Sequence, residues 1–247
     1  MAEANEDWIL PDWPCPRSVR ALITTRSGGV STGAFTSMNI GSAVGDTKEN
    51  VFENRRRLEV MLPSPPRWLR QVHGNRVVHA EQVRNNVDAD ASVATAVGAV
   101  CAVMCADCVP VLLCDRSGQV VAAAHAGWRG LCAGVLENTV QAMRVPKGDL
   151  LAYLGPAIGP KKFEVGDEVR AAFVKSDSQA ASCFQTLREG KWLADLFMLA
   201  QQRLRSVGLT AFYGAKDCTY SDPVRFFSHR RDKVTGRMAA LIWLSEL

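Results

Sequence analysis

Val120-Val-Ala-Ala-Ala124 is a run of five apolar residues with no polar residue between them. A strand with one solvent-exposed face alternates apolar and polar side chains, whereas a strand covered on both faces does not. The run Val109–Cys114, which precedes it in the chain, has the same apolar character. These two runs therefore predict strands, over Val109–Cys114 and Val120–His125, that are buried on both faces.

Further short apolar runs extend this pattern over most of the chain. The other predicted strands are Val19–Thr25, Arg67–Gln71, Arg76–Ala80, Ala99–Met104, Leu150–Leu154, Thr210–Tyr213 and Met238–Leu244. Apolar residues at helical spacing predict helices over Lys48–Met61, with Asp46 or Thr47 as its cap, and over Leu131–Met143, Val165–Val174 and Leu193–Val207. No linker divides these elements, so we expect one mixed α/β domain with a large central sheet system.

The bulk composition is that of an ordinary globular protein. The chain has 247 residues, 47% of them hydrophobic, and 29 basic against 25 acidic residues. These values exclude disordered, collagen-like and coiled-coil classes. No apolar run reaches the length of about 18 residues that a membrane span needs, and the first residues lack a signal peptide's positive charge. We expect a cytoplasmic protein that binds neither membrane nor nucleic acid, since no aromatic residues interleave with Arg55-Arg56-Arg57.

Histidine is scarce and cysteine is plentiful. The sequence contains four histidines and eight cysteines. Because thiols stay reduced in the cytoplasm, most of these cysteines are expected to pack as small hydrophobic residues. Any metal site must be small, since few imidazoles are available as ligands.

Three segments place reactive side chains where predicted strands end. They are Arg70-Gln-Val-His-Gly-Asn75, Cys105-Ala-Asp-Cys108 with the strand after it, and Ala124-His-Ala-Gly-Trp-Arg-Gly130. Together they offer His73, Cys108 and His125 as metal ligands. Three ligands with one open position are typical of catalytic zinc, whereas the same set with a weak axial Met104 would describe a blue-copper site.

Other interpretations of these residues remain open. Cys101, Cys105 and Cys108 have the thiol spacing of a cluster-binding radical enzyme, although two of them lie inside an apolar strand. Cys105 and Cys108 could form a redox pair. Cys108 with His73 or His125 could act as a thiolate–imidazole nucleophile. Each histidine could also be purely structural.

An ordered set of motifs resembles one known family. The motifs are Thr24-Thr-Arg-Ser-Gly-Gly-Val-Ser31, Met38-Asn-Ile-Gly41, Arg70-Gln-Val-His-Gly74, Ala106-Asp-Cys-Val-Pro110, Ala124-His-Ala-Gly-Trp-Arg-Gly130, Gly155-Pro-Ala-Ile-Gly159, Phe163-Glu-Val-Gly166, Asp217-Cys-Thr-Tyr220 and Ser228-His-Arg-Arg-Asp232 with Thr235-Gly-Arg237. From about Val19 to Leu244 the chain resembles the multicopper polyphenol oxidoreductases, or laccase-domain proteins. Members of this family are now described as purine nucleoside phosphorylases with adenosine deaminase activity.

The resemblance implies a fold and a metal site. The fold is a single-domain α-β-β-α sandwich with mixed sheets, similar to the catalytic domain of deamidating cysteine toxins. Residues 1–18 would be an N-terminal extension to a domain spanning 19–247. The family's ligand positions match His73, Cys108 and His125, which would hold zinc, or copper in some preparations. Other members often have Tyr where this chain has His229, so His229 is not among the expected ligands.

The resemblance also implies a reaction and its partners. We expect phosphorolysis of adenosine, inosine, guanosine and methylthioadenosine, with purine nucleosides and phosphate as partners, and deamination of adenosine. Apart from the resemblance, a monomer is the default expectation for a core of this size. The expected catalytic residues are Cys108, Asp107 and Arg129. Asp107 would replace the glutamate that zinc deaminases use as general acid and base, or would hold a histidine. Arg26, Asn39, Arg70 and Gln71 are expected to bind substrate.

Three further functions stay open as alternatives. One is a copper-dependent polyphenol oxidase, although four histidines are too few for a multicopper centre. Another is a cysteine amidase that edits peptidoglycan precursors. The third is a non-catalytic metal-binding module.

Overall fold

The two apolar runs form neighbouring antiparallel strands, β5 (Val109–Asp115) and β6 (Val121–Ala126), in the middle of a six-stranded sheet. The computed structural model describes residues 6–246. The strand order of this sheet is β11-β7-β5-β6-β3-β2, and both parallel and antiparallel pairs occur in it. The other four strands are β2 (Val77–His79), β3 (Ala91–Ala94), β7 (Leu150–Leu154) and β11 (Ala211–Gly214).

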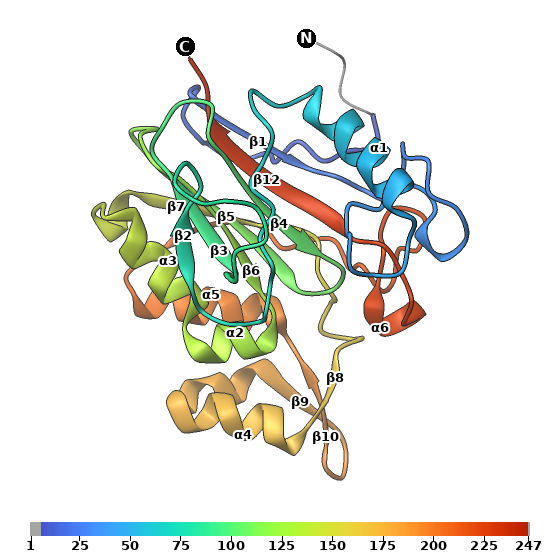
Figure 1. The fold of residues 1–247 in the computed structure, drawn as a ribbon. Helices are drawn as coiled ribbons and strands as arrows, with labels where there is room; N and C mark the ends of the chain where they lie inside the picture. The colour runs from blue at the N-terminus through green and yellow to red at the C-terminus, as the bar shows by residue number, and fades with distance from the viewer. Residues whose placement is uncertain (1–5, 247) are drawn as a thin grey trace.

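A second sheet of three antiparallel strands packs on one face of the first (Figure 1). Its order is β1 (Val19–Ile23), β12 (Met238–Leu244), β4 (Val100–Cys105). Side chains from both sheets form the core between them, among them Ile23, Val103, Leu112, Val121 and Ile242. This second sheet is one of the two layers that bury the central strands.

Helices cover the outer face of each sheet. The helix α1 (Lys48–Glu59) packs through Leu58 on the three-stranded sheet. The helices α2 (Trp128–Ala133), α3 (Val135–Met143) and α5 (Leu196–Ser206) cover the six-stranded sheet, as Figure 1 shows. The layers follow the order α-β-β-α, so the predicted sandwich is confirmed. They also explain why β5 and β6 lack alternation, since an apolar layer lies against each of their faces.

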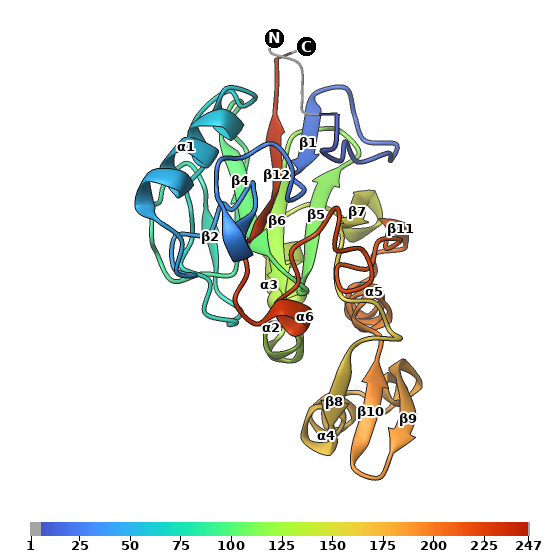
Figure 2. The ribbon, with the colours of Figure 1, turned by 90° about the vertical axis from the view of Figure 1, so that its right-hand side faces the viewer.

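A small sheet with one helix projects from the sandwich (Figure 2). It contains β8 (Glu164–Gly166), β10 (Lys191–Ala194) and β9 (Phe184–Arg188) in that order, together with α4 (Asp167–Ser176). The short helix α6 (His229–Asp232) precedes β12. Three 3₁₀ turns complete the described elements, at Gly33–Phe35, Lys147–Asp149 and Ser178–Cys183.

Three predicted helices differ from the observed ones. The predicted helix Leu131–Met143 is two helices, because Gly134 adopts the left-handed conformation (φ 89°) between α2 and α3. The predicted helices Val165–Val174 and Leu193–Val207 start too early, since their first residues belong to the short strands β8 and β10. A strand of three or four residues is too short to break a helical apolar pattern that follows it directly.

The predicted strand Arg67–Gln71 is wrong, and β3 was not predicted. The backbone of Arg70 forms only an isolated bridge with Asp88. The neighbouring backbone groups bond to the irregular segment 85–89 instead of a strand; for example, the N–H of Asn86 donates to the carbonyl of Trp68. β3 has the sequence Ala-Ser-Val-Ala, whose small side chains give a weak strand signal.

The described part of the predicted N-terminal extension packs on the sandwich. Ile9 pairs with Ile23 of β1, and Trp13 is buried in the core between the two sheets. The domain boundary between residues 18 and 19 stays a prediction. Among residues 6–246, no helix combines the length and the apolar character that crossing a membrane would require.

The break between α2 and α3 gives a stability prediction. Replacing Gly134 with Ala puts a Cβ on a left-handed residue, so the free energy of unfolding should fall by about 1–2 kcal/mol. Gly148→Ala is the matched control, because a Cβ there meets open space and should change stability by at most about 0.5 kcal/mol. Urea denaturation measures both values. Equal stability of Gly134→Ala and wild type would contradict this account of the break.

Candidate active site

His73, Cys108 and His125 come together in space from three separate segments. One potential ligand atom from each lies within 4.8 Å of the other two. The Sγ atom of Cys108 is 3.9 Å from Nε2 of His73, and the two imidazole rings lie 4.9 Å apart at 77°. His125 belongs to β6, Cys108 lies in the turn between β4 and β5, and His73 lies in a loop. We call these three residues the triad.

The buried carboxylate of Asp90 organises both histidines of the triad. Its Oδ1 accepts hydrogen bonds from the backbone N–H of His73 (3.0 Å) and from Nδ1 of His125 (2.9 Å). Its Oδ2 accepts the backbone N–H groups of Val72 (3.1 Å) and Gly74 (2.7 Å). His73 has a positive φ of 59°. The hydrogen bonds from three consecutive backbone N–H groups to Asp90 hold the loop in that conformation.

Asp90 also determines which nitrogen of His125 can act as a ligand. A carboxylate only accepts hydrogen bonds, so Nδ1 of His125 must carry the proton that is donated to Asp90. The Nε2 atom is then left for the triad. Asp90, which lies immediately before β3, was not among the residues predicted for the site.

The charges of the triad shift its pKa values in opposite directions. Burial alone would raise the pKa of the Cys108 thiol, but the charge of His125 and hydrogen bonds with His125 and His73 lower that pKa to about 6. Burial alone would lower the pKa of His125, but the Cys108 thiolate and the Asp90 carboxylate raise it to about 9. Without a metal, Cys108 and His125 therefore form a thiolate–imidazolium pair at neutral pH.

Gly127 keeps the space between the triad side chains open. A Cβ at this position would lie 2.9 Å from Sγ of Cys108 and 3.0 Å from Cδ2 of His73. Any other residue would therefore push against two members of the triad. Two imidazoles and one thiolate are a donor set that suits zinc or copper, so the residues present fit the metal that the family resemblance implies.

The triad lies in a pocket of about 610 Å³. This volume is within the range of ordinary small-molecule sites. Its apolar lining includes Trp128, Ile158, Phe163 and Leu196. Four arginines also line it, namely Arg70, Arg129, Arg230 and Arg237. The pocket thus combines aromatic and apolar surface with a concentration of positive charge.

Arg70, Gln71 and Arg129 line this pocket, as expected for substrate or catalytic residues. Arg70 forms an ion pair with Asp88, and the Arg129 guanidinium lies 4.4 Å from the centre of the Trp128 ring. The Nε2 group of Gln71 donates to the carbonyl of Met104 (2.8 Å), and its Oε1 accepts the backbone N–H of Met104 (2.7 Å). Gln71 therefore connects the loop that carries His73 to β4.

Arg26 and Asn39 do not line the pocket. Arg26 donates to the carbonyls of Thr36 (2.8 Å) and Pro223 (2.7 Å). Asn39 is fully buried, and its Oδ1 accepts the backbone N–H groups of Gly41 and Arg237, each at 2.9 Å. Since Gly41 and Arg237 line the pocket, Asn39 can affect a bound molecule only through them.

Asp107 lies beside Cys108, but its carboxylate is occupied by hydrogen bonds. Oδ1 accepts the hydroxyls of Thr219 (2.6 Å) and Ser228 (2.7 Å), and Oδ2 accepts the backbone N–H of Arg230 (2.6 Å). The residue is buried and has a positive φ of 97°. This arrangement attaches the start of α6 to the turn that carries Cys108.

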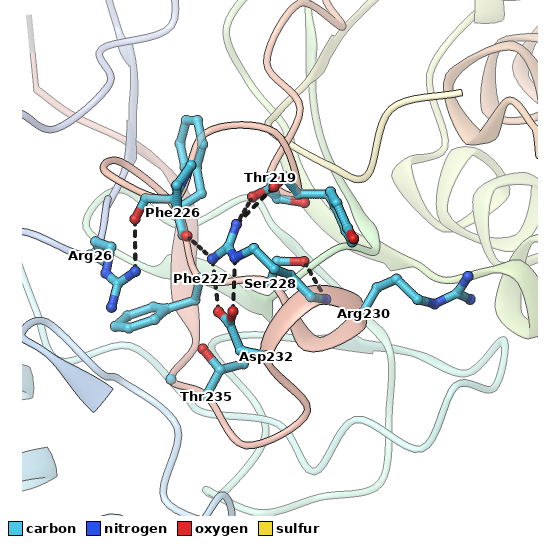
Figure 3. A network of polar contacts seen from close by, with 12 residues as sticks. Arg26, Thr219, Phe226, Phe227, Ser228, Arg230, Asp232 and Thr235 are labelled. Atoms are coloured by element: carbon cyan, nitrogen blue, oxygen red, sulfur yellow. Dashed lines mark hydrogen bonds and ion pairs between the residues drawn. The ribbon is translucent and has the colours of Figure 1, made fainter. Parts of the chain in front are cut away.

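Figure 3 shows the polar network around α6. Arg231 donates to the carbonyls of Thr219, Tyr220 and Phe226, and it pairs with Asp232 at 2.8 Å. Arg231 thereby ties the segment before α6 to the helix itself. Asp107 and Arg231 together hold α6 and the segment before it against the turn that carries Cys108.

His229, Arg230 and Arg237 also line the pocket. Arg230 and Arg237 were not among the predicted site residues, and His229 was considered only as a metal ligand and left out of the expected set. Arg230 donates to the carbonyl of Glu164 (2.6 Å) at the start of β8. Burial lowers the pKa of the Arg237 guanidinium, which donates to the carbonyls of Thr235 and Gly236. All three residues lie in the motif Ser228-His-Arg-Arg-Asp232 with Thr235-Gly-Arg237. Nothing in the spacing of this motif indicates that Arg230 bonds to Asp107, 123 residues earlier in the chain.

The Gly127 geometry gives a prediction for metal binding. Gly127→Ala should lower zinc affinity by about 10-fold or more, because its Cβ displaces Cys108 and His73 from their ligand positions. Competition with a chromogenic chelator measures the affinity, and Gly148→Ala is the control glycine in open surroundings. Unchanged affinity of Gly127→Ala would show that the metal does not sit between these side chains.

The low pKa of Cys108 gives a prediction for thiol reactivity. In metal-free protein, alkylation of Cys108 by iodoacetamide should rise with pH through a midpoint near 6, because only the thiolate reacts. Cys15 serves as the internal control, since burial raises the pKa of its thiol and its alkylation should need higher pH. Peptide mass spectrometry separates the two sites, and a Cys108 midpoint near that of an ordinary thiol would contradict the ion pair.

Comparison with known proteins agrees with these observations. Curated relatives named purine nucleoside phosphorylase include one from Pseudomonas aeruginosa, 53% identical over 97% of this chain and 99% of its own, and one from Escherichia coli, 52% identical over 96% and 98%. The crystal structure of a Neisseria meningitidis protein matches with a TM-score of 0.94 at 50% identity and covers 98% of this chain and all of its own. A protein from Geobacillus stearothermophilus matches with a TM-score of 0.91 at 31% identity, over 99% and 98% of the two chains.

A family model covers nearly the whole chain. It matches residues 20–245, a range that contains the triad, Asp90 and every pocket residue named above. With relatives about half identical over their full length, this match shows that the chain belongs to the multi-copper polyphenol oxidoreductase laccase family.

Proposed function

We propose that this protein is a metal-dependent purine nucleoside phosphorylase. The observation that carries the proposal is that the triad lies in one pocket together with four arginines and an aromatic lining. Phosphorolysis needs a phosphate site beside the glycosidic carbon and a surface for the purine. The names of the Pseudomonas and Escherichia relatives support the same activity.

His73, Cys108 and His125 are the proposed ligands of one zinc ion, or of copper. Held by these three residues, the ion would supply Lewis-acid chemistry to an oxygen of the substrate. In this proposal Cys108 is essential as a ligand.

The remaining pocket residues divide between the two substrates. We assign phosphate to the arginines, because guanidinium groups bind phosphate oxygens in a planar, bidentate way. Arg129 is the proposed catalytic cation, since its stacking on Trp128 leaves its charge without a carboxylate partner among the described residues. Trp128 and Phe163 supply ring surface for the base. Asn39 and Asp107 are proposed as positioning residues because their polar atoms bond to the protein itself.

The proposed substrates are adenosine, inosine, guanosine and methylthioadenosine, with deamination of adenosine as an additional reaction. Deamination requires water to attack C6 of the ring and a group that transfers protons. The carboxylate of Asp107 accepts three hydrogen bonds. To transfer protons in this reaction, it would have to give up one of these hydrogen bonds and form one with the substrate or water. We therefore expect phosphorolysis to be the faster reaction. The monomeric state and the cytoplasmic location stay predictions.

A product assay tests the proposed function. Zinc-loaded protein with inosine should yield hypoxanthine and ribose 1-phosphate only when phosphate is present, and adenosine should additionally yield ammonia. Cys108→Ala should lower the rate by about 1,000-fold or more, because it removes a ligand of the triad. Cys15→Ala is the control, since Cys15 lies away from the pocket and should leave the rate unchanged. Chromatography of the products measures all of these.

The same assay separates the alternative functions. Oxygen uptake with phenols and no release of base would indicate a copper-dependent polyphenol oxidase. Activity on peptidoglycan precursors that survives chelation but not thiol alkylation would indicate a cysteine amidase. Tight metal binding without turnover of any of these substrates would indicate a metal-binding module.

A further inference from the structure

Three of the four histidines line the same pocket, and one of them has no role in the triad. His229, the first residue of α6, borders the pocket with an exposed side chain. Its imidazole makes no hydrogen bond or ion pair with the residues that the structure describes. The remaining histidine, His79, lies on β2 outside the pocket.

The backbone around His229 is held more firmly than that of an ordinary exposed residue. The side chain of Ser228 and the backbone N–H of Arg230 both donate to Asp107, which precedes Cys108. Arg231 bonds to three carbonyls of the preceding segment (Figure 3). Its neighbours thus hold His229 in the lining of the pocket that contains the triad, while its own ring is available to a bound molecule.

The other charged groups around the pocket cannot supply a proton. A guanidinium group donates hydrogen bonds but does not act as a proton source in proteins, so the four arginines are not suited to this task. The carboxylate of Asp107 accepts three hydrogen bonds. His73, His125 and Cys108 form the proposed ligand set. On α6 itself, Arg231 and Asp232 pair with each other. Histidine exchanges a proton near neutral pH, so His229 is the pocket residue suited to this task.

We infer that His229 is the general acid that protonates N7 of the departing purine, an inference that rests on the proposed phosphorolysis. As a phosphate oxygen bonds to C1′ of the ribose, the electron pair of the C1′–N9 bond moves onto the purine ring. The His229 imidazolium gives its proton to N7, and the base leaves uncharged. The neutral imidazole regains a proton from water, and the ribose phosphate releases the proton of the attacking phosphate.

The test compares two leaving groups in one set of variants. Inosine needs a proton at N7, whereas 7-methylinosine already carries a methyl group and a positive charge there. His229→Phe should lower kcat for inosine by about 100-fold or more, and kcat for 7-methylinosine by less than about 3-fold. His229→Tyr keeps a proton donor, so it should recover part of the rate with inosine and shift the alkaline limb of its pH profile upward.

His79→Gln is the matched control and should leave the rates with both substrates unchanged. Zinc content and circular dichroism of each variant report whether the triad and the fold are intact, and His229→Gln replaces His229→Phe if the latter does not fold. Equal losses with inosine and 7-methylinosine would overturn the assignment of His229, as would an unchanged rate with inosine. A wild-type protein that cleaves neither nucleoside would instead overturn the proposed function.

Discussion

The structure of the pocket depends on one buried carboxylate, Asp90. A charged carboxylate without partners is costly in a protein interior, and this one accepts four N–H groups from two segments. Three of them come from consecutive amides of the His73 loop and the fourth from the His125 ring. The hydrogen bonds lower the pKa of Asp90 and keep it charged. The same bonds hold the two imidazoles close to each other and to Cys108, so the stability of the carboxylate and the geometry of the triad have a common cause.

A second aspartate, Asp107, plays a similar part for another segment that lines the pocket. The carboxylate oxygens of Asp107 accept hydrogen bonds from Thr219, Ser228 and the backbone of Arg230, which attaches α6 to the turn before β5. Neither aspartate offers a free carboxylate to the pocket. The chemistry is left to imidazoles, one thiolate and the guanidinium groups, which suits a phosphate-dependent reaction better than one that needs a carboxylate base.

The sequence allowed prediction of the features that depend on local order. The apolar runs of β5 and β6 predict strands that are covered on both faces. Cys108 and His125 could likewise be placed near strand ends, whereas the strand predicted before His73 does not form. At Gly134 the local pattern gives a wrong prediction of one continuous helix. The helical spacing of apolar residues continues across Gly134, although its left-handed backbone separates α2 from α3. Asp90, His229 and Arg237 reach the site through contacts between distant segments, such as that of Arg237 with Asn39. No pattern of spacing encodes such contacts. The fold brings the segments together through the pairing of β12 with β1 and β4.

X-ray absorption at the zinc edge of the loaded protein tests most directly whether Asp90 assembles a functional ligand set around Cys108. The account predicts one sulfur ligand at about 2.3 Å and two imidazole nitrogens at about 2.0 Å. In Asp90→Asn, which cannot hold both histidines in the same way, the imidazole contribution should fall while the sulfur ligand remains. A first shell without sulfur, or an imidazole signal unchanged by Asp90→Asn, would contradict it.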